Sequence, residues 1–161
     1  DLRIIIGSRG KDSFEIGNAK SELILDPGGD DTYKYTGNFN KTSLQIIIDY
    51  SGNDLYQGSE FRGPGTGFFG TGILIDKSGN DMYLGMDFCF GGAIGGLGFQ
   101  IDTSGNDIYK GRSFCFGAGI FGLGYLNDEE GRDSYEASIY SQVIGSTKGL
   151  GALIDKSGND L

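Results

Sequence analysis

Residues 71–83 read Thr-Gly-Ile-Leu-Ile-Asp-Lys-Ser-Gly-Asn-Asp-Met-Tyr, and this stretch recurs along the whole chain. Its Ser-Gly-Asn-Asp core is present four times, at residues 51–54, 78–81, 104–107 and 157–160, and three looser copies precede or separate these. The last Asp of successive copies falls at positions 12, 31, 54, 81, 107, 133 and 160, so the spacing settles at 26 or 27 residues. A fixed period of this length is the signature of a repeat architecture.

Other residue types keep step with the motif Asp. An aromatic residue follows it by two positions, and an acid that ends a short apolar run, such as Ile73-Leu74-Ile75, precedes it by five. Each unit therefore reads as a strand, an acidic turn, a second strand and a glycine-rich turn. Glycines also recur in i, i+2 pairs, such as Gly96 and Gly98. Such pairs share one strand face and favour a close approach of two sheets, with glycine corners at positive φ as the alternative.

These units predict an all-β fold, a parallel β-solenoid of about seven coils of ~26 residues, in which the first coils are shorter. Equivalent residues would then stack ~4.8 Å apart in parallel ladders. The alternative is an antiparallel meander of repeated hairpins, because Ser-Gly-Asn-Asp also suits a hairpin turn. We expect residues 1–161 to form a single repeat domain that is part of a longer array.

The chain is acidic and rich in glycine, with a net charge of −9, 31 Gly and no His. The lack of histidine excludes Ser-His and Cys-His catalysis and histidine-ligated metals. The acid excess argues against nucleic acid and anionic membranes as partners and favours cations. No apolar run reaches the ~18 residues of a membrane span.

The acidic turn has the sequence Asp-x-Ser-Gly-Asn-Asp and provides oxygen donors at four of its six positions. Ca²⁺ takes six to eight such hard oxygen ligands. Stacked carboxylates ~4.8 Å apart would also repel one another unless a cation or a raised pKa relieved them. The predicted ligands are the carboxylates of Asp49, Asp54, Asp76, Asp81, Asp102, Asp107, Asp128, Asp133, Asp155 and Asp160. A turn stabilised without metal, with an amide ladder of Asn53, Asn80 and Asn106, is the alternative.

The segment Gly28-Gly29-Asp30-Asp31-Thr32-Tyr33 and the Ser-Gly-Asn-Asp-x-Tyr copies resemble the Gly-Gly-x-Gly-x-Asp turns of RTX calcium-binding β-rolls. The likeness covers only the turn, about a quarter of each unit, and the nonapeptide period of that family is replaced by ~26 residues. The longer unit is also similar to repeat arrays of exported bacterial proteins. The resemblance implies secretion, calcium-dependent folding and a surface or adhesive role.

Two further columns follow from the period. Phe61, Phe88, Phe114 and Tyr140 stand seven residues after a motif Asp, where they either pack in the core or form an outward ligand-binding column. Cys89 and Cys115 are also one period apart, so stacking would place them close enough for a disulfide or for two packed thiols.

These features predict a non-catalytic structural or adhesive repeat domain, stabilised by Ca²⁺ and able to associate with itself end to end or laterally. The second hypothesis is a module that binds glycan, a cell surface or ice through its outward aromatic column. A polysaccharide-active enzyme is the third hypothesis. It is disfavoured because a glycosidase needs two carboxylates in unlike surroundings, whereas these acids repeat identically.

Overall fold

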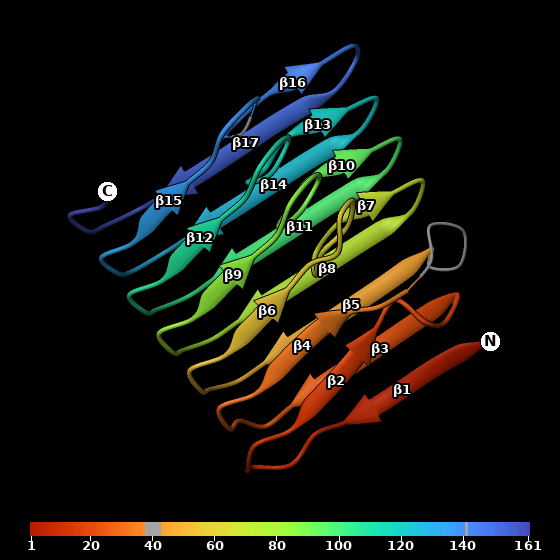
Figure 1. The fold of residues 1–161 in the computed structure, drawn as a ribbon, viewed down its shortest axis with the longest axis vertical. Helices are drawn as coiled ribbons and strands as arrows, with labels where there is room; N and C mark the ends of the chain where they lie inside the picture. Colours follow the sequence, from red (N-terminus) through yellow and green to blue (C-terminus); the bar gives the residue numbers. More distant parts are fainter. Residues whose placement is uncertain (38–42, 141) are drawn as a thin grey trace.

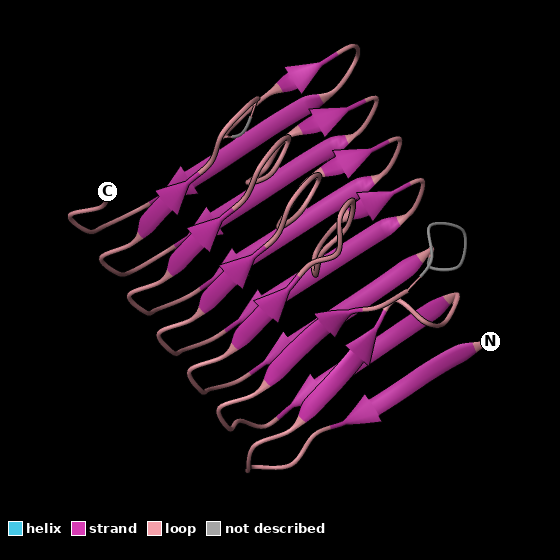
Figure 2. Cartoon of the chain, in the orientation of Figure 1, coloured by secondary structure: helices cyan, strands magenta, loops and turns pink. Residues whose placement is uncertain are grey.

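The computed structural model describes residues 1–37, 43–140 and 142–161, and it shows a parallel β-solenoid. Each coil crosses one long sheet, makes the acidic turn, crosses a second sheet and, from the third coil onward, adds a short strand in a third sheet (Figure 1). The described residues contain strands, turns and bends but no helix (Figure 2). Among them, therefore, no helix is long and apolar enough to cross a membrane.

The described strands form three parallel sheets, of which sheet A runs the length of the stack and sheet C covers only its third to sixth coils. Sheet A contains β1 (Leu2–Ile6), β3 (Ser21–Asp26), β5 (Leu44–Asp49), β8 (Thr71–Asp76), β11 (Leu97–Asp102), β14 (Leu123–Asp128) and β17 (Leu150–Asp155). Sheet B contains β2 (Ser13–Ile16), β4 (Thr32–Tyr35), β6 (Leu55–Gln57), β9 (Met82–Leu84), β12 (Ile108–Lys110) and β15 (Ser134–Glu136). Sheet C contains β7 (Gly67–Phe68), β10 (Ala93–Ile94), β13 (Gly119–Ile120) and β16 (Gly145–Ser146).

The register between coils follows the sequence period. Asp49 pairs with Asp76, Asp76 with Asp102, and Asp102 with Asp128, always in parallel. This confirms the solenoid and excludes the antiparallel meander for the described strands. The stack makes about five turns, slightly fewer than the seven coils expected. In the described part of the chain, the first two coils lack a sheet C strand, and the last contributes only β17.

The interior is built from residues that alternate along the strands of sheets A and B. Ile24, Ile47, Leu74 and Leu126 form a fully buried column on sheet A. Facing it, the tyrosines two positions after the motif Asp stack with ring centroids 4.6–4.8 Å apart and form the other side of the core. Stacked rings add about 0.5–1.5 kcal/mol per pair beyond the burial of their area.

Sheet C packs directly on the inward glycines of sheet A. A Cβ built on Gly72, Gly98 or Gly124 would overlap the backbone carbonyl of Thr66, Gly92 or Ala118 in the adjacent sheet C segment. The close approach expected from the glycine pairs is thus confirmed for the second glycine of each pair. Sheets A and C are therefore in backbone contact at these glycines.

Candidate metal centre

Two columns of aspartate side chains face each other inside the solenoid, beside the acidic turn. One column ends the strands of sheet A and includes Asp49, Asp76, Asp102 and Asp128, each with no exposed surface. The other follows the turn and includes Asp31, Asp54, Asp81, Asp107 and Asp133, which are 1–3% exposed. Because the residues alternate along each strand, the last residue of a sheet A strand points inward with the core. The same applies to the Asp that precedes sheet B.

The turn column is held by a backbone ladder. The amide of Asp54 donates to Oδ1 of Asp81 at 2.7 Å, and the amides of Asp81 and Asp107 donate to the next motif Asp in the same way. The second oxygen of each side chain has no partner. Five such buried Oδ2 atoms are found among the described residues, on Asp31, Asp54, Asp81, Asp107 and Asp133.

The strand column is bound by the stacked tyrosines. The hydroxyl of Tyr83 donates to Oδ2 of Asp102 at 2.5 Å, and that of Tyr109 donates to Oδ2 of Asp128 at 2.9 Å. Oδ1 of Asp102 and Oδ1 of Asp128 are buried without a partner. The tyrosines therefore serve as hydrogen-bond donors to the acids as well as core residues, a role that the sequence reasoning missed.

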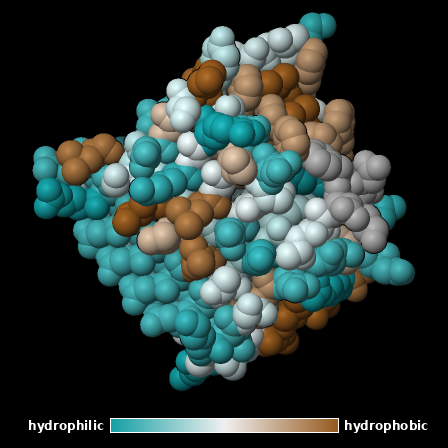
Figure 3. Space-filling view, in the orientation of Figure 1, coloured by the Kyte–Doolittle hydropathy of each residue, from teal (hydrophilic) through white to brown (hydrophobic). Residues whose placement is uncertain are grey.

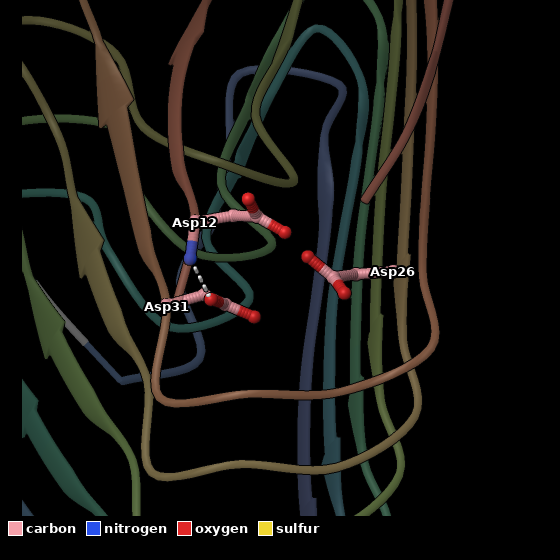
Figure 4. Close-up of side chains that lie close together, drawn as sticks. All are labelled: Asp12, Asp26 and Asp31. Atoms are coloured by element: carbon pink, nitrogen blue, oxygen red, sulfur yellow. Dashed lines mark hydrogen bonds between the residues drawn. The ribbon is translucent and has the colours of Figure 1, made fainter. Parts of the chain in front are cut away.

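The two columns form a series of carboxylate triads. In the first, shown in Figure 4, Asp12 and Asp31 approach from successive turns while Asp26 points at them from the facing strand. Three oxygens, one from each residue, lie within 4.8 Å of one another. The same arrangement recurs in the triads Asp31/Asp49/Asp54, Asp54/Asp76/Asp81, Asp81/Asp102/Asp107 and Asp107/Asp128/Asp133. Asp31, Asp54, Asp81 and Asp107 each belong to two consecutive triads.

This spacing suits one cation per triad. Two oxygens that share a Ca²⁺ at 2.3–2.6 Å are at most about 5.2 Å apart. Carboxylate oxygens are hard ligands, and the triads contain neither His nor Cys, so they fit Ca²⁺ rather than zinc or copper. Oxygens that lack a hydrogen-bond donor are the atoms that a cation would take.

Burial and mutual repulsion raise the pKa values of these acids. Desolvation is the largest cause, followed for Asp81 and Asp102 by the charge of a neighbouring Asp. The pKa of Asp81 rises to about 10, that of Asp102 to about 9, that of Asp54 to about 8 and that of Asp107 to about 7. Without a cation, therefore, several of these carboxyl groups keep a proton near neutral pH.

The turn itself differs from the expected ligand loop. Asp76 and Asp81, at its first and last positions, point inward, whereas Asn80 lies outside and donates to Oδ1 of Asn53 at 3.3 Å. The amide ladder continues from Asn106 to Asn80, as predicted for the turn without metal. The outer edge is uniformly hydrophilic, at the lower left of Figure 3. The candidate centre is thus inside the coil and not on this edge.

Eight of the ten predicted ligands, those from Asp49 to Asp133, lie in the triads named above. Asp155 and Asp160 lie at the last coil, where Asp155 is partly exposed and Asp160 exposed, and Asp160 accepts from the amide of Asp133 at 2.9 Å. The triads also use Asp12, Asp26 and Asp31, which were not among the predicted ligands. The signal that finds them is the period itself, since all three occupy the same phase as the predicted acids.

The outward aromatic column is partly formed. Phe88 stacks on Phe114 with ring centroids 5.0 Å apart, and Phe114 stacks on Tyr140 at 5.4 Å. Phe88 and Phe114 are half-buried, Tyr140 is 63% exposed, and Phe61 lies one coil below and is 40% exposed. The three stacked residues have φ of 52°, 53° and 49°, a left-handed conformation that is uncommon for aromatic residues.

The two cysteines lie next to the outward aromatic column as buried free thiols. The Cys115 thiol donates to the carbonyl of Met86 at 3.1 Å, and that of Cys89 donates to the carbonyl of Asp87 at 3.3 Å. Burial raises the pKa of Cys89, whereas its hydrogen bond to Cys115 lowers the pKa of Cys115. The disulfide stays a prediction.

Charged side chains also form ion pairs between coils. Arg112 binds both oxygens of Asp87, at 2.9 and 2.5 Å, and Lys110 contacts Glu136 at 3.0 Å. Asp87 is therefore held as a structural partner of Arg112.

Comparisons with protein-family models, with curated proteins and with solved structures found no match for this chain.

Proposed function

We propose that this chain is a non-catalytic structural repeat module whose interior carboxylate triads bind Ca²⁺, one ion per triad, so that successive ions hold successive coils together. The observation that carries the proposal is the set of buried Oδ2 atoms without partners. Each is carried by an Asp that belongs to a triad in which one oxygen per residue lies within 4.8 Å of the others.

The electrostatics give the reason why a cation stabilises the fold. Two carboxylates at this spacing repel by about 3.5 kcal/mol at an effective dielectric constant near 20. Each triad relieves that repulsion either by keeping protons or by binding a cation. Ca²⁺ tolerates irregular coordination at 2.3–2.6 Å, whereas Mg²⁺ demands near-ideal octahedral geometry at 2.0–2.1 Å. Because Asp31, Asp54, Asp81 and Asp107 each bridge two triads, occupied triads support one another along the stack.

This proposal fits a domain that acts outside the cell as a spacer or adhesive module. Extracellular modules use Ca²⁺ affinities of about 10⁻⁴–10⁻³ M, and a binding site that also joins coils makes the folded state depend on such concentrations. The repetition of the same triad in coil after coil supports a structural role, because a catalytic site needs groups in unlike environments.

The test is thermal unfolding in excess chelator, in Ca²⁺ and in Mg²⁺ at the same ionic strength. A site that is saturated at 100 times its Kd stabilises the fold by about 2.7 kcal/mol, so we expect a large rise in the unfolding midpoint with Ca²⁺ and a smaller one with Mg²⁺. Equal midpoints in chelator and in about 5 mM Ca²⁺, a concentration above the extracellular affinity range, would show that the triads are stabilised by protons alone.

A second candidate function is glycan binding by the outward aromatic column. It is favoured by the stacked Phe88, Phe114 and Tyr140, which hold left-handed backbone conformations that cost about 1–3 kcal/mol each. Tyr140→Ala should weaken binding to a glycan panel. The control is Tyr50→Ala, which removes a similarly exposed ring, 56% against 63%, from the acidic turn. Equal binding by both variants would exclude this function.

A further inference from the structure

The outer face of sheet A is apolar in every coil. The first, third and fifth residues of each strand point away from the interior, which gives 21 outward positions on seven strands. None is charged, and the three small polar exceptions are Ser21, Thr71 and Asn127. The other positions are Leu, Ile, Ala, Phe or Tyr, with Ile46, Ile73 and Phe99 in the middle.

Sheet B gives an internal comparison, because it faces solvent in the same coils. Its outward positions include the charged residues Glu15, Lys34, Lys110 and Glu136. That alternation of apolar inside and polar outside is normal for a sheet with one solvated face. Sheet A departs from it although 22% of the chain is charged. The solenoid therefore does not require an apolar outer face, and sheet A has one for another reason.

Sheet A is covered by the chain on its inner side. Its strands contact one another and the short strands of sheet C, and sheet C packs against the inward glycines. On the outer side, side chains are shielded by their neighbours in the ladder but still reach solvent, as Leu97 does with 43% exposure. Contiguous apolar patches above about 300–600 Å² mark interaction surfaces on soluble proteins.

We propose that the outer face of sheet A is a dimer interface that packs on the same face of a second copy of this chain. The proposal does not depend on cation binding. A sheet of seven strands spaced ~4.8 Å apart, each about six residues long at ~3.3 Å per residue, has a face of roughly 600 Å². Two copies would bury roughly 1,200 Å² in total, which reaches the range of specific interfaces.

A second copy fits this face better than other occupants. Two identical faces have the same rung spacing, so their side chains interdigitate over the whole stack as in aligned sheet packing, ~10 Å apart. A two-fold axis parallel to the stack reverses the strands of the partner and places the two acidic turn edges on opposite sides. This arrangement separates the charges of two chains that each carry −9. An anionic lipid surface, in contrast, would be repelled by that charge.

The test compares two double variants on the same two coils. Ile73→Lys with Phe99→Lys places two charges on adjacent rungs of the outer face of sheet A, and Met82→Lys with Ile108→Lys does so on sheet B. Sedimentation velocity from about 1 μM to about 1 mM gives the mass. We expect wild type and the sheet B variant to reach twice 17.2 kDa, and the sheet A variant to dimerise at least tenfold more weakly.

Circular dichroism and the unfolding midpoint check that both double variants remain folded. If the Lys pair unfolds the chain, Ile73→Thr with Phe99→Thr keeps strand propensity and should still weaken the dimer. If wild type is a monomer at all concentrations, the proposal is overturned. This holds even if the monomer binds an insoluble polysaccharide or a vesicle. Association of the sheet A variant as strong as that of wild type would overturn it too, and would indicate contact through the end coils.

Discussion

The backbone amide of Asp81 donates a 2.7 Å hydrogen bond to Oδ1 of Asp107, and the other oxygen of Asp107 is left buried without a partner. One carboxylate oxygen thus fixes the register between coils, while the other has no hydrogen-bond donor. Asp107 belongs to two of them, with Asp81 and Asp102 on one side and with Asp128 and Asp133 on the other. A single substitution at Asp107 therefore changes two candidate sites at once.

Asp107→Asn separates cation binding from folding. The amide keeps an oxygen that accepts from the Asp81 backbone, and its NH₂ group donates to the acids around it. In chelator we expect the free energy of unfolding to rise by about 1 kcal/mol, because a buried repulsion becomes a hydrogen bond. In Ca²⁺ the variant should lose two sites and a large part of the Ca²⁺-induced rise in midpoint.

The matched control is Asp30→Asn. It removes the same charge from an exposed turn position, where Asp30 accepts from the amide of Asn53 at 2.9 Å, a bond that Asn retains. The rise in its unfolding midpoint on addition of Ca²⁺ should equal that of wild type. If Asp107→Asn responds to Ca²⁺ as strongly as Asp30→Asn does, the triads around Asp107 hold no cation.

The raised pKa values predict an unusual pH dependence in chelator. Asp102 and Asp81 titrate near 9 and 10 in the fold but near 3.8 when unfolded. Between pH 4 and those values the folded chain binds more protons than the unfolded chain, so stability falls as the pH rises. The slope is of the order of 1 kcal/mol per pH unit for each such group. The stabilisation is complete only below about pH 4.

Saturating Ca²⁺ should reverse this trend, because cation binding requires ionised carboxylates and strengthens as protons leave. Unfolding midpoints between about pH 5 and about pH 8, measured with and without Ca²⁺, should therefore diverge as the pH rises. A chelated protein that becomes more stable over this interval would contradict the pKa values from which the prediction starts.

The period made most of the fold predictable. A motif Asp every 26 or 27 residues with apolar runs in phase leaves few alternatives to stacked coils, and the register of Asp76 on Asp102 follows directly. The number of strands per coil was harder to predict from the sequence. β7 and its equivalents are two residues long, and they form because Gly67 and Gly72 allow the backbones of sheets A and C to meet.

The acids of the candidate site were predictable, but their direction was not. A turn sequence does not say whether Asp76 and Asp81 point out with Asn80 or in towards the tyrosines, because this depends on how sheet B closes over sheet A. The hydroxyl contact of Tyr83 with Asp102 joins residues 19 positions apart, and only the coil geometry brings them together. The same holds for triads, whose members come from two coils.

Gly98→Ala tests the close approach of sheets A and C. A Cβ at Gly98 would overlap the carbonyl of Gly92 and lie 2.9 Å from its carbon, so the backbone of one sheet must move. We expect a loss of about 1–3 kcal/mol, as in overpacked cores. The control Gly10→Ala meets only Ser8 Oγ at 3.7 Å and should stay within about 0.5 kcal/mol of wild type. Urea titrations of both variants give the comparison, and equal midpoints would mean that the sheets are not in backbone contact at Gly98.

Gln100 interrupts the apolar column of sheet A between Leu74 and Leu126, and it is fully buried with neither amide atom bonded. An unpartnered buried amide costs about 1–3 kcal/mol, and leucine fills a similar volume. Gln100→Leu should therefore stabilise the fold by that amount and raise the unfolding midpoint by several degrees.

Gln45→Leu is the control, because Gln45 is also buried but donates to Glu22 at 3.4 Å. Loss of Gln45 therefore removes a hydrogen-bond donor from the Glu22 carboxylate. Differential scanning calorimetry should show a higher midpoint for Gln100→Leu and an unchanged or lower one for Gln45→Leu. A drop for Gln100→Leu would mean that the Gln100 amide has a partner in solution, such as a buried water, that the leucine displaces.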